Sequence, residues 1–126
     1  MERKIIFTPN APAPVGPYSQ AIQANDFLYV SGQIPVDPKT GQVNKESFEK
    51  ECRLVLDNLK AVVEAGGSSL EKVVKVNIYL KDMAKFAELN KIYAEYFNDS
   101  KPARACVQVG MLPLDVDVEI EAVALV

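Results

Sequence analysis

The strongest constraint on the fold is a change of hydrophobic period near the middle of the chain. From Phe48 to Val63, apolar residues recur at every third or fourth position, as on an amphipathic helix. Gly66 and Gly67 follow, and glycine readily ends a helix in a left-handed conformation. Over residues 73–80, aliphatic residues then alternate with others, which is the period of a strand. The chain therefore predicts a helix packed against a sheet.

The rest of the chain predicts a second helix and more strands. Asp82 is a favourable N-cap, and apolar residues from Phe86 to Phe97 again share one helical face. Asn25 and Asp26 join two strand-like runs as a hairpin turn, because both tolerate a positive φ. The other expected strands cover residues 4–8, 18–24, 27–34, 103–111 and 116–126.

The resulting order, β-β-β-α-β-α-β-β, predicts an α+β fold: a six-stranded mixed sheet with two helices packed on one face. Residues 1–126 are expected to form a single domain with one core. The uncovered sheet face would carry apolar side chains such as Tyr79, Val123 and Leu125. Such a face favours self-association.

The amino-acid composition limits which ligands and catalytic groups the chain can use. The 14 Lys and Arg and 17 Asp and Glu give a net charge of −3, so no general attraction for nucleic acid or anionic lipid is expected. The chain has no His, which excludes Ser-His and Cys-His nucleophile pairs, and two Cys make no zinc site, so no metal is expected. General acid–base catalysis would fall to Glu, Asp, Tyr, Lys or water. The lack of a long apolar run at the N-terminus predicts a cytoplasmic protein without a membrane segment.

The last two expected strands carry the candidate chemical groups. Strand alternation places Arg104 and Cys106 on one face, and it places Glu119 opposite Val118 and Ile120. If the apolar faces of both strands meet the helices, then Arg104, Cys106 and Glu119 project together from the uncovered side. They would form either a functional site or a structural ion pair, within the chain or with a neighbouring subunit. Spacing leaves both interpretations open.

Several short motifs along the chain form a recognisable set. They are Gly16-Pro17-Tyr18-Ser19-Gln20, Ser31-Gly32-Gln33-Ile34-Pro35, Asp57-Asn58, Pro102-Ala103-Arg104-Ala105-Cys106-Val107, Gly110, Leu112 and Val118-Glu119-Ile120. This set resembles the signature of the reactive-intermediate deaminase (Rid) family, RidA in particular, also known as the YjgF or L-PSP endoribonuclease family. The resemblance runs essentially from end to end. It implies a chorismate-mutase-like fold, a homotrimer with active sites in clefts between subunits, and no cofactor.

The resemblance also implies roles for residues. Arg104 would hold the substrate carboxylate through two parallel hydrogen bonds. Glu119 matches the glutamate associated with the hydrolytic water, and Cys106 would contact the substrate largely through backbone groups. Tyr18 is a further candidate catalytic group. The positions that line the pocket are matched by Tyr18, Ser31, Gly32 and Asn90.

The implied activity is that of a 2-iminobutanoate/2-iminopropanoate deaminase. Such an enzyme hydrolyses reactive 2-imino and 2-enamino acids, including 2-aminoacrylate, to 2-keto acids and ammonia. Two other functions stay open. One is a ribonuclease or translation inhibitor, which the missing His and the net charge oppose. The other is a non-enzymatic module that binds small carboxylates in the same Arg104 cleft.

Each candidate residue also has a purely structural interpretation. Tyr18 could be a buried aromatic at the start of the hairpin, and Asn90 a solvated helix residue. Ser31 and Gly32 could form a bulge whose small residues admit a neighbouring backbone. Cys106 could be an inert buried thiol, because a reactive thiolate needs a nearby positive charge such as Arg104.

Overall fold

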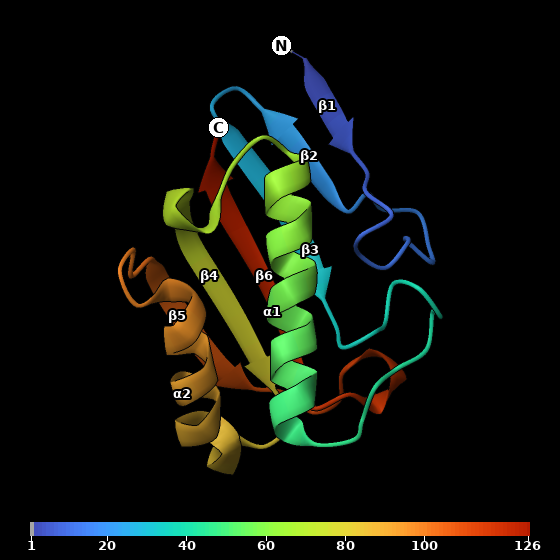
Figure 1. Ribbon diagram of the computed structural model, residues 1–126, viewed down its shortest axis with the longest axis vertical. Helices are drawn as coiled ribbons and strands as arrows, with labels where there is room; N and C mark the ends of the chain where they lie inside the picture. The colour runs from blue at the N-terminus through green and yellow to red at the C-terminus, as the bar shows by residue number, and fades with distance from the viewer. Residues whose placement is uncertain (1) are drawn as a thin grey trace.

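Residues 2–126, described in a computed structural model, form a sheet with two helices on one face (Figure 1). The sheet order is β1-β2-β3-β6-β4-β5, in which β4 and β5 are parallel and every other pair is antiparallel. The strands are β1 (Arg3–Ile6), β2 (Ala21–Ala24), β3 (Phe27–Gln33), β4 (Val73–Leu80), β5 (Ala103–Gln108) and β6 (Val118–Leu125). The predicted α+β class with a six-stranded mixed sheet is confirmed.

Helix α1 (Phe48–Ala65) crosses the middle of the sheet, as Figure 1 shows. The hydroxyl of Ser47 caps it by accepting the N–H of Lys50 at 3.1 Å. At the other end, Gly67 takes the left-handed conformation at φ +83°, as the glycine pair predicted. Gly66 serves a different purpose, because a Cβ there would lie 2.6 Å from a methyl carbon of Leu28 on β3. Glycine thus lets the end of the helix approach the sheet.

Helix α2 (Phe86–Phe97) lies beside α1, over the β4 and β5 side of the sheet. Asp82 does cap a helical segment, but the segment is the short 3₁₀ turn η2 (Met83–Lys85), where its carboxylate accepts the N–H of Ala84 at 2.9 Å. The α-helix begins only after this turn. Within residues 2–126, no helix is both long enough and apolar enough to cross a membrane.

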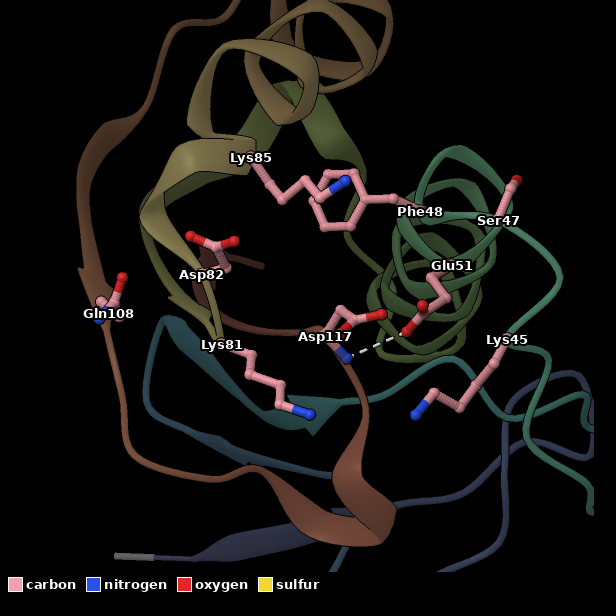
Figure 2. Close-up of a pocket in the computed structure, with 9 residues that line it drawn as sticks. All are labelled: Lys45, Ser47, Phe48, Glu51, Lys81, Asp82, Lys85, Gln108 and Asp117. Atoms are coloured by element: carbon pink, nitrogen blue, oxygen red, sulfur yellow. Dashed lines mark hydrogen bonds between the residues drawn. The ribbon is translucent and has the colours of Figure 1, made fainter.

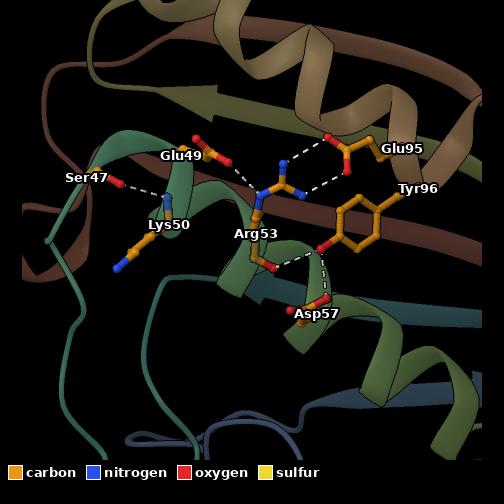
Figure 3. A network of polar contacts seen from close by, with 7 residues as sticks. All are labelled: Ser47, Glu49, Lys50, Arg53, Asp57, Glu95 and Tyr96. Atoms are coloured by element: carbon orange, nitrogen blue, oxygen red, sulfur yellow. Dashed lines mark hydrogen bonds and ion pairs between the residues drawn. The ribbon is translucent and has the colours of Figure 1, made fainter.

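A polar network joins the outer faces of the two helices (Figure 3). Arg53 of α1 donates two hydrogen bonds of 2.9 Å to Glu95 of α2 and one of 3.0 Å to Glu49. These carboxylates raise the pKa of Arg53 above its ordinary value. Tyr96 of α2 donates to Asp57 of α1 at 2.8 Å. The network is exposed, so it orients the helices more than it stabilises the fold.

In the described part of the chain, both helices lie on one face of the sheet and none covers the other face (Figure 1). In β6, Val118, Ile120, Ala122 and Ala124 are buried, so the alternate residues Val123 and Leu125 face away from the helices, as predicted. Tyr79 pairs with Glu119 and shares this open face, also as predicted. The open face is partly apolar: exposed fractions are 49% for Tyr29, 40% for Leu125 and 39% for Phe27.

Candidate active site

Arg104 lies on the edge strand β5 and faces helix α2. Its Cζ atom lies 5.5 Å from the centre of the Phe86 ring and 4.8 Å from the centre of the Tyr93 ring. In the parallel pairing with β4, Arg104 stands opposite Val76, which is fully buried in the core. Arg104 and its strand neighbour Cys106 therefore lie on the helix-covered face. The expectation that they project from the uncovered face is wrong.

The edge position of β5 explains the error. The apolar residues of this strand, Ala105 and Val107, face the open side of the sheet, where Val107 is 47% exposed. The arginine instead places its guanidinium against the aromatic rings of α2. A long amphipathic side chain can cover apolar surface in this way while its charge stays near solvent. The polar side of β5 is thus the covered side.

Arg104 has no ion-pair partner within the part of the chain that the structure describes. Its guanidinium contacts two aromatic faces instead, an arrangement that attracts a cation through the ring quadrupole. An ion pair with Glu119 inside one protomer is therefore excluded as the explanation of this residue. No carboxylate of residues 2–126 occupies the donor groups of this half-buried guanidinium.

Glu119 lies on the open face of the sheet. It sits on β6 opposite Tyr79 of β4 and is half-buried. Burial raises the pKa of Glu119, and the nearby carboxylate of Glu121 raises it further. A carboxylate with a raised pKa is a stronger base. Glu119 and Arg104 thus occupy opposite faces of one protomer.

Gly32 lies directly beneath the Glu119 side chain. Strand β3 has one extra residue between Val30 and Gln33, which makes a bulge against β6. A Cβ on Gly32 would collide with the carboxylate of Glu119, so any other residue would displace it. The predicted bulge is confirmed, but it admits a side chain rather than a backbone. Ser31 secures it by donating its hydroxyl to the carbonyl of Ser19 at 2.6 Å.

Tyr18 lies near the bulge and is 51% exposed, so it is not the buried aromatic of the structural interpretation. Its hydroxyl accepts the N–H of Val15 at 3.4 Å. Tyr18 and Gly32 both line a pocket of about 250 Å³. The apolar part of its wall includes Pro12, Ala13, Val15, Ile34, Val36 and Leu114. The buried side chain of Asn58 supports this region by donating to the carbonyls of Ile34 and Val36.

Asn90 and Cys106 belong to the Arg104 side. The Oδ1 atom of Asn90 is buried and has no hydrogen-bond partner among residues 2–126, and the same is true of the Tyr93 hydroxyl. Asn90 is therefore not the solvated residue of its structural interpretation. Cys106 packs against the core, and burial raises the pKa of its thiol although Arg104 opposes this. Cys106 lacks the lowered pKa of a reactive thiolate.

The structure thus separates the predicted residues into two groups. Arg104, Cys106 and Asn90 lie on the α2 side of β5. Glu119 and Gly32 lie together on the open side, with Ser31 in the same bulge and Tyr18 at the adjoining pocket. Sequence reasoning missed the rings beneath Arg104. The helical period places Phe86 and Tyr93 on the apolar face of their helix, and only the structure shows that this face reaches β5.

A second hollow of about 590 Å³ lies near the start of α1. Figure 2 shows Glu51 beside Asp117, whose N–H donates to the Glu51 carboxyl at 3.0 Å. Glu51 is only 1% exposed. Burial raises the pKa of Glu51 to about 7, and the Asp117 carboxyl adds to the rise. The sequence signal for this buried carboxyl is an acidic residue on the apolar stripe of the helix. Three lysines, Lys45, Lys81 and Lys85, also line this hollow.

Fold and site together define a class: an α+β chain with a half-covered sheet and, at the sheet edge beneath a helix, an arginine that pairs with no carboxylate of residues 2–126. The chain belongs to the Endoribonuclease L-PSP family, whose model matches residues 8–126. The resemblance to the Rid family is confirmed, and so is the chorismate-mutase-like fold that it implied. Within residues 2–126, no three His, Cys, Asp or Glu side chains gather to hold a metal ion.

Relatives match over nearly the whole chain. A RutC family protein from Pyrococcus horikoshii is 57% identical over 122 residues, which is 97% of each chain. A Yersinia pestis protein of the conserved Rid protein family has 44% identity and a TM-score of 0.97, covering 99% of this chain and 100% of that one. The structure of E. coli TdcF with bound serine has 40% identity and a TM-score of 0.92, covering 98% of each chain.

Proposed function

We propose that this protein hydrolyses reactive 2-imino and 2-enamino acids to 2-keto acids and ammonia. The observation that carries the proposal is the guanidinium of Arg104, which is half-buried on two aromatic rings and has no carboxylate partner among residues 2–126. Its planar fork can bind a substrate carboxylate through two parallel hydrogen bonds. Small 2-imino acids carry their carboxylate next to the reacting carbon, so this anchor would also position that carbon.

The site requires two protomers. Arg104 and Glu119 lie on opposite faces of one sheet, so one copy of the chain cannot bring both to one substrate. A neighbouring copy packed on the open face would bring its edge strand β5 towards Glu119, Gly32 and Tyr18. The exposed apolar residues of the open face support such packing. The assembly is a closed homotrimer, in which each interface forms one site.

The reaction needs a water molecule and three proton transfers. Arg104 holds the carboxylate, and the half-buried carboxylate of Glu119 takes a proton as water adds to the carbon of the protonated imine. Glu119 then gives this proton to the nitrogen, which leaves as ammonia as the C–N bond breaks, and the new hydroxyl gives its proton to Glu119 as the keto group forms. An enamine first gains a proton at its terminal carbon to become the protonated imine. Backbone groups near Cys106 orient the substrate, and Tyr18, Ser31, Gly32 and Asn90 line the cleft.

Two observations on relatives bear on this choice. E. coli TdcF was solved with bound serine, which carries a nitrogen on the carbon next to its carboxylate, as a 2-imino acid also does. The family description names an endoribonuclease, and a Thermotoga maritima relative with a TM-score of 0.97 is a putative endoribonuclease. The present chain offers neither His nor a net positive charge for RNA cleavage. A ligand-binding protein without turnover would use the same arginine.

One coupled assay tests the proposal. A pyridoxal-dependent dehydratase generates 2-iminobutanoate, and keto-acid formation is followed with and without the protein. We expect the protein to accelerate the release of 2-oxobutanoate, and we expect Arg104→Ala to abolish the acceleration. Binding of 2-oxobutanoate without any acceleration would instead identify a carboxylate-binding module. RNA cleavage that Arg104→Ala removes would favour the ribonuclease.

A further inference from the structure

The two rings beneath Arg104 form an aromatic shelf, which we define as the side chains of Phe86 and Tyr93. Both rings lie within cation–π distance of the Arg104 Cζ atom, at 5.5 Å and 4.8 Å respectively. The residues are seven positions apart on α2, which places them two turns apart on one helical face. The shelf therefore extends along the helix opposite β5.

Tyr93 is the fixed part of the shelf. This residue is 8% exposed, and its ring stacks on the ring of Phe97, with 4.7 Å between centroids and 30° between planes. Phe86 is only partly buried and lies farther from the guanidinium. A buried ring that stacks on a second ring has little freedom to follow a moving guanidinium. The Tyr93 ring therefore presents one face to the guanidinium at a fixed position.

We propose that Tyr93, assisted by Phe86, is a positioning residue that fixes the Arg104 guanidinium in the plane and place needed to grip the substrate carboxylate. The proposal rests on the proposed function in so far as Arg104 binds that carboxylate. The physical reason is entropic. A free arginine side chain loses rotamer freedom on binding, and a guanidinium already held on a ring loses less of it.

The aromatic shelf holds the Arg104 guanidinium in place, as a carboxylate partner usually does for an arginine. A carboxylate would hold the guanidinium through its N–H donors and leave few for the substrate, as Glu95 does for Arg53. A ring contacts the face of the guanidinium instead and leaves its edge free. A ring can therefore fix the guanidinium without competing with the ligand for its N–H donors.

The first measurement reads the position of Arg104 directly. The chain has only three arginines, Arg3, Arg53 and Arg104, so their side-chain Nε–H signals can be assigned by single substitutions. Protons over an aromatic face resonate upfield. We expect an upfield, narrow Arg104 signal in the full-length wild-type protein and in Tyr93→Phe. We expect Tyr93→Leu to move it to the position of a free arginine.

The second measurement reads the consequence for binding and turnover. Tyr93→Leu should weaken pyruvate binding about tenfold in calorimetry and raise KM by a similar factor, with kcat nearly unchanged. Tyr93→Phe should restore wild-type affinity, because the ring acts and the hydroxyl does not. Tyr96→Leu is the matched control: it removes a ring from the same helix, but one that faces α1 through Asp57. It should leave affinity and the Arg104 signal unchanged.

The outcomes separate this inference from the proposed function. An unchanged Arg104 signal and pyruvate affinity in Tyr93→Leu overturn the shelf, whatever the protein catalyses. Equal losses in Tyr93→Phe and Tyr93→Leu also overturn it, because they assign the effect to the hydroxyl. If Tyr93→Leu fails to fold, Phe86→Leu provides the same test with a smaller expected effect. Pyruvate binding that depends on Tyr93 in a protein without deaminase activity supports the shelf and contradicts the deaminase.

Discussion

At the scale of single residues, two arginines of this chain show opposite arrangements. Arg53 gives its donors to Glu49 and Glu95 on the surface of the helices. Arg104 rests on Phe86 and Tyr93, and in residues 2–126 it has no carboxylate partner. The first arrangement joins elements of the fold. The second leaves hydrogen-bond donors available for a ligand.

This difference predicts the effect of Arg104→Lys. Lysine keeps the charge but loses both the planar fork and the stacking face, so deaminase activity should fall roughly ten- to a hundredfold or more. Arg53→Lys is the matched control, with the same chemical change on the outer helix surface, and its activity should stay within about twofold of wild type. The dehydratase-coupled assay measures both. Activity of Arg104→Lys within twofold of wild type would show that Arg104 is structural.

A second prediction concerns Glu119→Gln. The amide keeps the shape over Gly32 and one acceptor oxygen, but it cannot take a proton. Turnover should fall about 100- to 10,000-fold, while pyruvate binding in calorimetry should change little. Normal turnover in Glu119→Gln would show that another group activates the water, either Tyr18 or the amine of the substrate itself. Loss of assembly in this variant would make the carboxylate structural.

At the scale of elements, the sequence predicted helices and strands well because each has its own period. The alternation in β6 also gave its covered face correctly, since Val118 and Ile120 lie in the core. The alternation in β5 gave the wrong face. This strand lies at the sheet edge beneath the aromatic side of α2, and its apolar residues face outward. Periodicity reports which residues share a face, but the partner of that face depends on contacts between distant segments.

Helix α1 carries a pH-dependent contact at its first turn. Burial and the Asp117 carboxyl raise the pKa of Glu51 to about 7 from 4.5. A carboxyl whose pKa is raised by folding stabilises the native state in its protonated form. That contribution is complete below the unfolded pKa of 4.5 and is lost as pH rises through about 7.

Glu51→Gln should remove this dependence. Glutamine keeps an acceptor for the Asp117 N–H and stays neutral at every pH. Between about pH 5 and about pH 8, urea unfolding should show wild-type stability falling by about 2 to 3 kcal/mol relative to Glu51→Gln. Glu46→Gln on the exposed surface is the control, and it should follow the wild-type curve. Parallel curves for wild type and Glu51→Gln would show that Glu51 does not titrate in this range.

At the scale of the whole molecule, the open sheet face is the surface on which the proposed trimer would assemble. Tyr29 lies on this face and is 49% exposed, so a closed trimer would cover it. Light scattering should give a mass near three chains for the wild type at micromolar concentration. Tyr29→Glu would place a charge in the interface and should shift the mass towards one chain. Lys60→Glu, on the outer surface of α1, should stay trimeric. A wild-type monomer would contradict both the trimer and a site between protomers.

Because Arg104 and Glu119 face opposite sides of one sheet, the proposed site between protomers predicts that two inactive chains rescue one another. A site that takes its arginine from one chain and its glutamate from the next is intact whenever an Arg104→Ala chain supplies the glutamate and a Glu119→Gln chain supplies the arginine. If equal amounts of the two inactive proteins are unfolded together and refolded, about a quarter of the sites should therefore be complete. Each variant refolded alone should have no intact site. Recovered activity in the mixture would show that each active site belongs to a pair of chains. Two different inactivating mutations expressed in one cell could then complement each other.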